Sequence, residues 1–199
     1  SHEDFLEKFS PSVKGRGFFY FDSVGLARPE ITHYRKRLNE RYTPPKNARL
    51  LLLLVPQTRN KPFHKAPEFK KIRQLQRGLG KEFSGKVHVC VYSAPFGVVP
   101  LELDEVYPLS QHESALPLDC ETVEYVADQV AGYVKRMNYV SVVLLNDPKL
   151  WSDKVKKTCR SACKEKGLTF NYVDANVQGS KKILSRLDLI LRKQLSEKP

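Results

Sequence analysis

Residues 49–71 read RLLLLLVPQTRNKPFHKAPEFKK, and this stretch decides the fold. It opens with an unbroken apolar run from Leu50 to Val55, which Pro56 ends. The run is too short to span a membrane, and its length is typical of a strand buried on both faces inside a parallel sheet. We therefore expect an α/β fold with this strand at its centre.

The polar segment that follows, residues 57–65, carries the basic side chains Arg59, Lys61, His64 and Lys65. In open α/β sheets, ligands bind beyond the carboxyl ends of the strands. The segment is therefore either a ligand-binding loop or a solvated loop that happens to be basic.

Strand-like and helix-like segments alternate along the rest of the chain. Further strands are expected at 86–92, 139–145 and 168–173, and helices at 29–42, 67–83, 121–138, 150–166 and 181–195. This alternation predicts a three-layer α/β/α domain with a central four-stranded, mainly parallel sheet. The loops at 56–66, 93–100, 146–149 and 174–180 would then meet on one rim of that sheet.

Other segments are expected to be less regular. Residues 93–100 contain two prolines and a glycine, which predicts a loop, and residues 109–119 predict an irregular connection. Residues 3–9 predict a short helix, and the aromatic cluster Phe18–Phe21 favours packing over base stacking. We expect an N-terminal extension, residues 1–48, packed on a core domain, residues 49–199, as one structural unit.

The composition favours a polyanionic partner. The 199 residues include 34 Lys and Arg against 22 Asp and Glu, a formal charge of +12, and 41% are hydrophobic. Nucleic acid is the leading candidate for such a basic chain, and simple solubility is the alternative. No signal peptide or membrane segment is visible in this sequence, so we expect a cytoplasmic protein with no membrane partner.

The four cysteines do not predict a metal site. Cys90 lies in an apolar run, Cys159 and Cys163 share one helix face, and no CxxC pair is present. Reduced thiols in an intracellular protein are the simpler interpretation. The sequence also lacks GxxxxGK[ST], GxGxxG and GxSxG motifs, so we expect no nucleotide cofactor and no hydrolase elbow.

Three segments resemble archaeosine synthase and the related archaeal tRNA-guanine transglycosylases. They are KPF at 61–63 behind Pro56, SAPFGVVPLELDEVYP at 93–108, and RPEITHYRKRLNERY at 28–42. The resemblance implies a fold like that of uracil-DNA glycosylase. It also implies a role on archaeal tRNA, where the family adds nitrogen to the nitrile of a 7-cyano-7-deazaguanine base.

The family pattern is degenerate at its reactive positions. Pro56, Lys61 and Pro62 match it, and Phe63 replaces a tyrosine. Gln57, Ala66 and Phe69 stand where the family has Cys, Ser and His. A thiol that could attack a nitrile is therefore missing from this motif, and we expect a catalytically weak or inert domain.

The resemblance and the strand-end positions together assign roles to individual residues. Catalytic roles fall to Lys61 and Glu102, and phosphate contacts to Arg59, Lys65, Lys70 and Lys71. Base contacts fall to Pro62, Phe63, Ser93, Phe96, Gly97, Tyr107 and Asn146. A core role for each aromatic, and a solvated role for Glu102, are the alternatives.

Three functions remain open. The first is a domain that binds tRNA or a 7-deazaguanine-type base with little or no catalysis. The second is an active base-modifying or glycosylase-like enzyme, in which Glu102, Asp104, His64 or Asn146 would supply the acid or base. In that case an unpartnered Glu102 beside prolines would have a raised pKa. The third is a non-catalytic subunit that docks a transglycosylase or another tRNA-modification subunit.

Overall fold

The structure is a computed structural model that describes residues 18–20, 23–46, 50–106, 108–110, 112–175 and 180–197. Its strands are β1 (Phe18–Tyr20), β2 (Leu51–Pro56), β3 (Val87–Ser93), β4 (Gly97–Pro100), β5 (His112–Ser114), β6 (Ser141–Asn146) and β7 (Thr169–Asp174). Its α-helices are α2 (Pro29–Glu40), α3 (Pro67–Gly78), α4 (Lys81–Ser84), α5 (Cys120–Arg136), α6 (Pro148–Trp151), α7 (Lys154–Lys166) and α8 (Ser180–Ser196). Short 3-10 turns are η1 (Ser23–Ala27), η3 (Phe63–Lys65) and η4 (Leu101–Leu103).

The central sheet has the strand order β4-β3-β2-β6-β7. Strand β2 pairs in parallel with both β3 and β6, and β6 pairs in parallel with β7. Residues 51–54 of β2 are fully buried, as expected for a strand covered on both faces. The four predicted parallel strands are therefore confirmed.

A fifth strand, β4, corrects the expectation of an irregular loop at residues 93–100. The chain turns at Gly97 and runs back along β3, so that Tyr92 pairs with Val98 in antiparallel register. Gly97 has φ +87°, and a Cβ there would lie 2.5 Å from the Gln129 Cβ. The glycine thus permits both the turn and the close approach of α5. The two prolines in this segment favoured the prediction of a loop in place of a strand.

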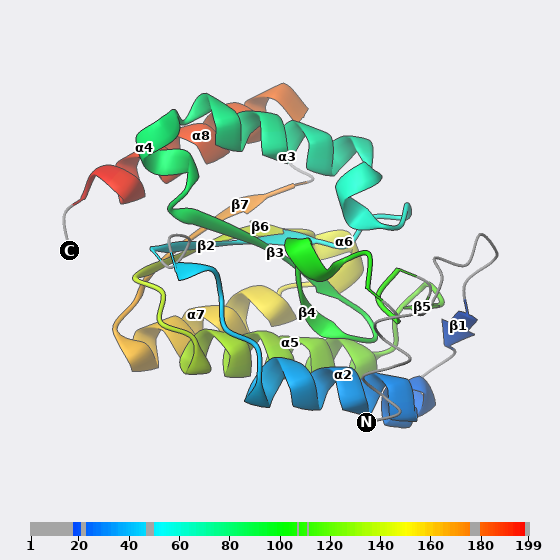
Figure 1. The fold of residues 1–199 in the computed structure, drawn as a ribbon. Helices are drawn as coiled ribbons and strands as arrows, with labels where there is room; N and C mark the ends of the chain where they lie inside the picture. Colours follow the sequence, from blue (N-terminus) through cyan, green and yellow to red (C-terminus); the bar gives the residue numbers. More distant parts are fainter. Residues whose placement is uncertain are drawn as a thin grey trace.

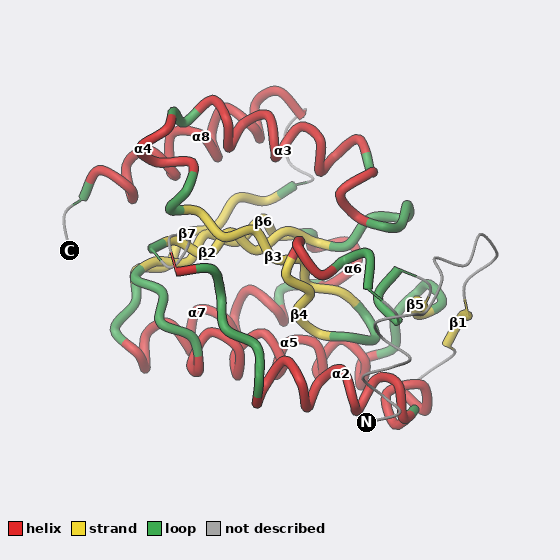
Figure 2. Tube along the Cα trace, viewed as in Figure 1, coloured by secondary structure: helices red, strands yellow, loops and turns green. Residues whose placement is uncertain are grey.

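Helices cover both faces of the sheet (Figures 1 and 2). Helices α3, α4 and α8 lie on one face, and α2, α5 and α7 lie on the other. This arrangement confirms the three-layer α/β/α fold. The finer likeness to uracil-DNA glycosylase stays a prediction.

Two predicted helices are interrupted. The helix expected at 67–83 divides into α3 and α4 at Gly80, where φ is +88°. The helix expected at 150–166 is α7, preceded by the separate turn α6, and Asp147 caps α6 by accepting from the Lys149 N–H at 3.2 Å. In both places a residue with positive φ breaks the helical path, since Ser152 has φ 48°.

The connection expected to be irregular at 109–119 contains β5, which pairs in parallel with β1. Phe18–Tyr20 of the aromatic cluster therefore form a strand, and Phe21 lies outside the described residues. Residues 3–9, where a helix was predicted, lie outside the described part of the chain. The domain boundary at residue 48 also stays a prediction, because 47–49 are not described. No helix among the described residues is long and apolar enough to cross a membrane.

Candidate functional site

The sheet has a topological switch point between β2 and β6. From β2 the chain crosses to β3, whereas from β6 it crosses to β7 on the opposite side. The segments after these two neighbouring strands therefore diverge and leave a crevice at their carboxyl ends. In α/β sheets, ligands bind at such a point.

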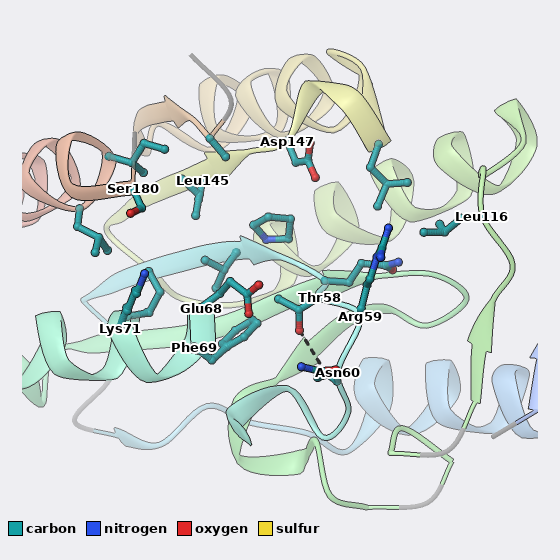
Figure 3. Close-up of a pocket in the computed structure, with 18 of the residues that line it drawn as sticks. Thr58, Arg59, Asn60, Glu68, Phe69, Lys71, Leu116, Leu145, Asp147 and Ser180 are labelled. Carbon is teal, nitrogen blue, oxygen red and sulfur yellow. Dashed lines mark hydrogen bonds between the residues drawn. The ribbon is translucent and has the colours of Figure 1, made fainter. Parts of the chain in front are cut away.

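A cavity of about 1010 Å³ lies at this place, and we call it the switch-point cavity (Figure 3). Its apolar part includes Val55, Leu145, Leu150 and Ile183. Its polar side chains are Gln57, Thr58, Arg59, Asn60, Glu68, Lys71, Ser114, Asp147 and Ser180. The cavity is at the upper end of the usual size for small-ligand sites, so it has room for a nucleotide.

Gln57 holds two rim loops together. Its backbone N–H donates to the Tyr92 carbonyl at 3.0 Å. Its side-chain Oε1 accepts from the Ala94 N–H at 2.8 Å and from the Ser93 hydroxyl at 3.2 Å. The loops that follow residues 55 and 92 therefore meet, as the parallel arrangement of their strands predicted.

Lys61 lies over the rings of Phe63 and Phe96, with its Nζ 5.4 Å and 5.3 Å from their centroids. Both rings are only 1% exposed. Phe96 packs edge-on against Tyr34, and Phe63 packs against Phe69. Their burial favours the core role that the sequence left open, and their role in base contact stays a prediction.

The acidic segment after β4, residues 101–105, makes polar contacts with the basic loop at residues 57–65. Asp104, which is 2% exposed, accepts from the His64 backbone N–H at 2.8 Å and lies 3.0 Å from its Nδ1. Glu105 lies 3.2 Å from the His64 Nε2 and 4.0 Å from the Lys65 Nζ. His64 and Asp104, two candidate acids or bases, therefore pair with each other.

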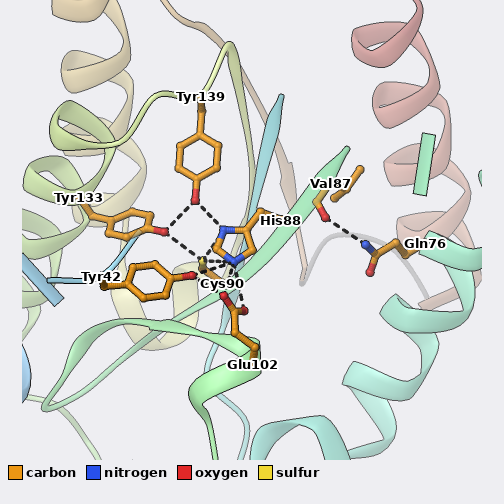
Figure 4. A network of polar contacts seen from close by, with 8 residues as sticks. All are labelled: Tyr42, Gln76, Val87, His88, Cys90, Glu102, Tyr133 and Tyr139. Carbon is orange, nitrogen blue, oxygen red and sulfur yellow. Dashed lines mark hydrogen bonds and ion pairs between the residues drawn. The ribbon is translucent and has the colours of Figure 1, made fainter. Parts of the chain in front are cut away.

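Glu102 belongs to a polar cluster on the α5 side of β3, which we call the His88 network (Figure 4). The Glu102 carboxylate lies 2.9 Å from the His88 Nε2 and accepts from the Tyr42 hydroxyl. On its other side, the His88 Nδ1 lies 2.6 Å from the Tyr139 hydroxyl, which in turn lies 2.7 Å from that of Tyr133. Cys90 completes the cluster, 3.6 Å from the His88 Nδ1.

The charges in this network are matched. Burial alone would raise the pKa of Glu102, but hydrogen bonds and charge from His88, and the bond from Tyr42, bring it below the usual value. Burial lowers the pKa of His88, whereas Cys90 and Glu102 raise it, to about 10. The expected raised pKa of an unpartnered Glu102 is therefore wrong, because His88 and Tyr42 are its partners.

Of the residues assigned to phosphate contact, Arg59 and Lys71 line the switch-point cavity. Lys70 borders a second, smaller groove beside α3. Lys65 lies outside both linings, next to Glu105. Among the assigned cations, Arg59 and Lys71 are thus the pair that lines this cavity.

The remaining assigned residues are mostly internal. Ser93 and Asn146 are fully buried, and Asn146 donates to the Asp174 Oδ1 at 2.8 Å. Gly97 is the first residue of β4, and Pro62 is half-buried. Tyr107 lies outside the described residues. None of these four described residues lines the switch-point cavity.

Sequence reasoning missed the polar residues that α3, α6 and α8 bring to the cavity. Glu68 comes from the first turn of α3, Asp147 from the cap of α6, and Ser180 from the start of α8. Their positions just beyond strand ends, at the starts of helices, were the available signal. Within the described ranges, no group of three or more His, Cys, Asp and Glu is placed to hold a metal ion.

A family model described as a domain of unknown function, DUF5591, matches residues 31–191. The chain belongs to the DUF5591 family. The match covers every element of the central sheet and the helices on both of its faces.

Curated relatives of this DUF5591 domain carry names from tRNA modification. The tRNA-guanine(15) transglycosylase of Methanosphaera stadtmanae is 32% identical over 148 residues, which is 71% of this chain and 21% of the relative. The archaeosine synthase subunit alpha of Thermococcus kodakarensis is 41% identical over 105 residues, 51% of this chain and 17% of the relative. The Saccharolobus solfataricus tRNA-guanine(15) transglycosylase is 30% identical over 151 residues, 75% of this chain and 28% of the relative.

These relatives confirm the resemblance to the archaeosine synthase-related family. The matched part of the chain spans only 17% to 28% of the length of each. Among solved structures, that of AF0587, a protein of unknown function, has a TM-score of 0.54 at 20% identity. It covers 84% of this chain and 51% of its own, which supports the fold alone.

Proposed function

We propose that this DUF5591 domain takes part in tRNA base modification by binding tRNA, and that it is itself catalytically weak or inert. The observation that carries the proposal is the switch-point cavity, at the place where α/β sheets hold ligands, with Arg59 and Lys71 in its lining. Its relatives are named for acting on tRNA or making archaeosine. A net charge of +12 suits a polyanionic partner.

The residues at this cavity favour a binding role for the domain over a catalytic one. Gln57 and Phe69, which replace the family's Cys and His, both line it, and Ala66, which replaces the Ser, is buried. Gln57 already holds two rim loops. Glu102 is engaged by His88 and Tyr42 away from the cavity. The positions that would carry the family's reaction therefore have side chains suited to packing and hydrogen bonding.

Within this proposal, Arg59 and Lys71 neutralise backbone phosphates while an unpaired nucleotide enters the cavity. The exposed side chain of Glu68, which also lines the cavity, is positioned to contact its base. The domain would act in the cytoplasm, delivering tRNA to a transglycosylase or another modification subunit.

Fluorescence anisotropy with a labelled tRNA transcript tests the proposal. We expect saturable binding that weakens at least about tenfold between about 50 mM and about 200 mM salt, because counterions are released from several phosphates. Arg59→Gln with Lys71→Gln should weaken binding and reduce the salt slope by about two units.

The matched control is Lys157→Gln with Lys164→Gln. These two exposed lysines lie on α7, across the sheet from α3, and their replacement removes the same charge. Its binding should stay close to that of the wild type. Absence of tRNA binding by the wild type, or an equal loss in both double variants, would overturn the proposal.

A further inference from the structure

A second groove, of about 410 Å³, lies between α3 and the segment at residues 101–105. Its two walls have opposite charge. Glu102, Asp104 and Glu105 line one wall, and the other is lined by Lys70, Arg73 and Arg77 from α3. His64 and Leu101 complete the lining.

The acidic wall is already satisfied by other parts of the chain. His88 and Tyr42 hold Glu102, and His64 holds Asp104. Glu105 lies beside His64 and Lys65. These carboxylates therefore have hydrogen-bond or ion-pair partners that do not come from α3.

The basic wall has no such partners. Lys70, Arg73 and Arg77 are exposed and share one face of α3, because they follow one another at intervals of three and four residues. None of the three side chains makes a hydrogen bond or ion pair with another described residue of the chain. A groove with paired carboxylates and three unpaired cations selects an anion.

We propose that this groove binds backbone phosphates of RNA, as a second phosphate site separated from the switch-point cavity by α3. The inference rests on the proposed function and extends it. Lys71 lines the cavity from the same helix whose other face presents Lys70, Arg73 and Arg77 to the groove. An RNA strand that places a nucleotide in the cavity thus crosses α3, with neighbouring phosphates held in the groove.

The test compares three triple variants of the 199-residue chain by anisotropy with the tRNA transcript. Lys70→Gln, Arg73→Gln and Arg77→Gln together remove the groove cations. Lys36→Gln, Lys157→Gln and Lys164→Gln remove the same charge from exposed positions on α2 and α7. Lys70→Arg, Arg73→Lys and Arg77→Lys keep the charge of the groove.

We expect the groove variant to bind tRNA about tenfold or more weakly at low salt, with a salt slope reduced by about two units. The control and charge-keeping variants should stay close to the wild type. If the groove variant binds like its control while Arg59→Gln with Lys71→Gln weakens binding, the groove inference is wrong and the proposed function stands. If the wild type does not bind tRNA, both are wrong.

Calorimetric titration with inorganic phosphate separates RNA from a small phosphate compound as the occupant. If RNA is the occupant, we expect the wild type to show no saturable binding of inorganic phosphate that is absent from the groove variant. If the wild type binds inorganic phosphate, the groove variant loses that binding, and tRNA affinity is unchanged, the occupant is a small phosphate compound and the RNA inference is overturned.

Discussion

The switch-point cavity and the His88 network are both clusters of polar side chains on the same sheet. They differ because the cavity encloses open space, whereas the network is closed by its own contacts. In the cavity, the exposed side chains of Arg59, Glu68 and Lys71 line about 1010 Å³ of open space. In the network, His88 is 4% exposed and each polar group contacts another within the cluster. A polar residue becomes a candidate for function when its hydrogen-bonding capacity is left for a ligand, and not merely because it is polar.

The largest effect should follow from breaking the His88 network. His88→Leu removes the one partner that Glu102 and Tyr139 share, while Tyr42 and Tyr133 still contact them. We expect the free energy of unfolding to fall by about 2 kcal/mol. Urea unfolding measures this loss, and Glu102, whose side chain is 38% exposed, regains some hydration. Arg59→Gln with Lys71→Gln should weaken tRNA binding by the same factor in the folded variant as in the wild type, because Glu102 borders the second groove and not the cavity. A different factor in fully folded protein would contradict the division between the two clusters.

A smaller loss of stability should follow from Gln57→Ala, which removes a contact between the two rim loops. The variant removes the acceptor of the buried Ala94 N–H, at a cost of about 1 to 2 kcal/mol in the free energy of unfolding. It should also weaken tRNA binding, because Arg59 lies two residues further along the loop. Gln74→Ala, at an exposed position of α3, is the control and should change neither quantity. Unchanged stability in Gln57→Ala would show that the rim loops do not depend on this contact.

The pH dependence of stability should come from the network. The pKa of His88 is raised from 6.5 to about 10, so its contribution is full below about pH 6.5 and is lost as the pH rises toward 10. The pKa of Glu102 is lowered, so its contribution is present above its unfolded value of 4.5 and is lost on acidification. Stability should therefore be greatest between these two limits.

Urea unfolding from pH 5 to pH 9 measures this dependence. In Glu102→Gln, His88 loses one of the groups that raise its pKa. The decline in unfolding free energy above about pH 6.5 should be shallower by about 1 kcal/mol in total. An identical decline in both proteins would show that Glu102 does not contribute to the pH dependence of stability.

The smallest effect on stability is expected for Arg59→Gln with Lys71→Gln. These residues line open space, so the free energy of unfolding should change by no more than about 0.5 kcal/mol even though tRNA affinity falls. Thermal unfolding, measured beside the binding titration, checks this. A loss of stability as large as that of His88→Leu would mean that the cavity cations support the fold.

Several features of the fold were predictable because they depend on local pattern. The apolar run at 50–55 required burial on both faces, and the alternation of strands and helices required a parallel sheet with helices on both sides. Strand β4 was missed because a short antiparallel strand after a tight turn carries the same proline and glycine signals as a loop. The turn at Gly97 is recognisable only once α5 is known to approach it.

The position of the candidate site was predictable from the sequence, but the full set of residues that form it was not. Parallel strands end on the same edge, so the sequence placed the loops after residues 55 and 92 together, and Gln57 joins them. It also indicated Arg59 and Lys71. The raised pKa expected for Glu102 was wrong, because its partners His88 and Tyr42 are 14 and 60 residues away in the chain.

The sequence by itself determined the layer architecture, the edge of the sheet where a ligand would bind, and the family, because these follow from the periodicity of apolar residues and from contiguous motifs. Tertiary structure alone decided which charged side chains are matched and which are available. Pairing depends on distances between residues far apart in sequence. The same carboxylate has a raised pKa when it is buried alone and a lowered one when a histidine lies beside it.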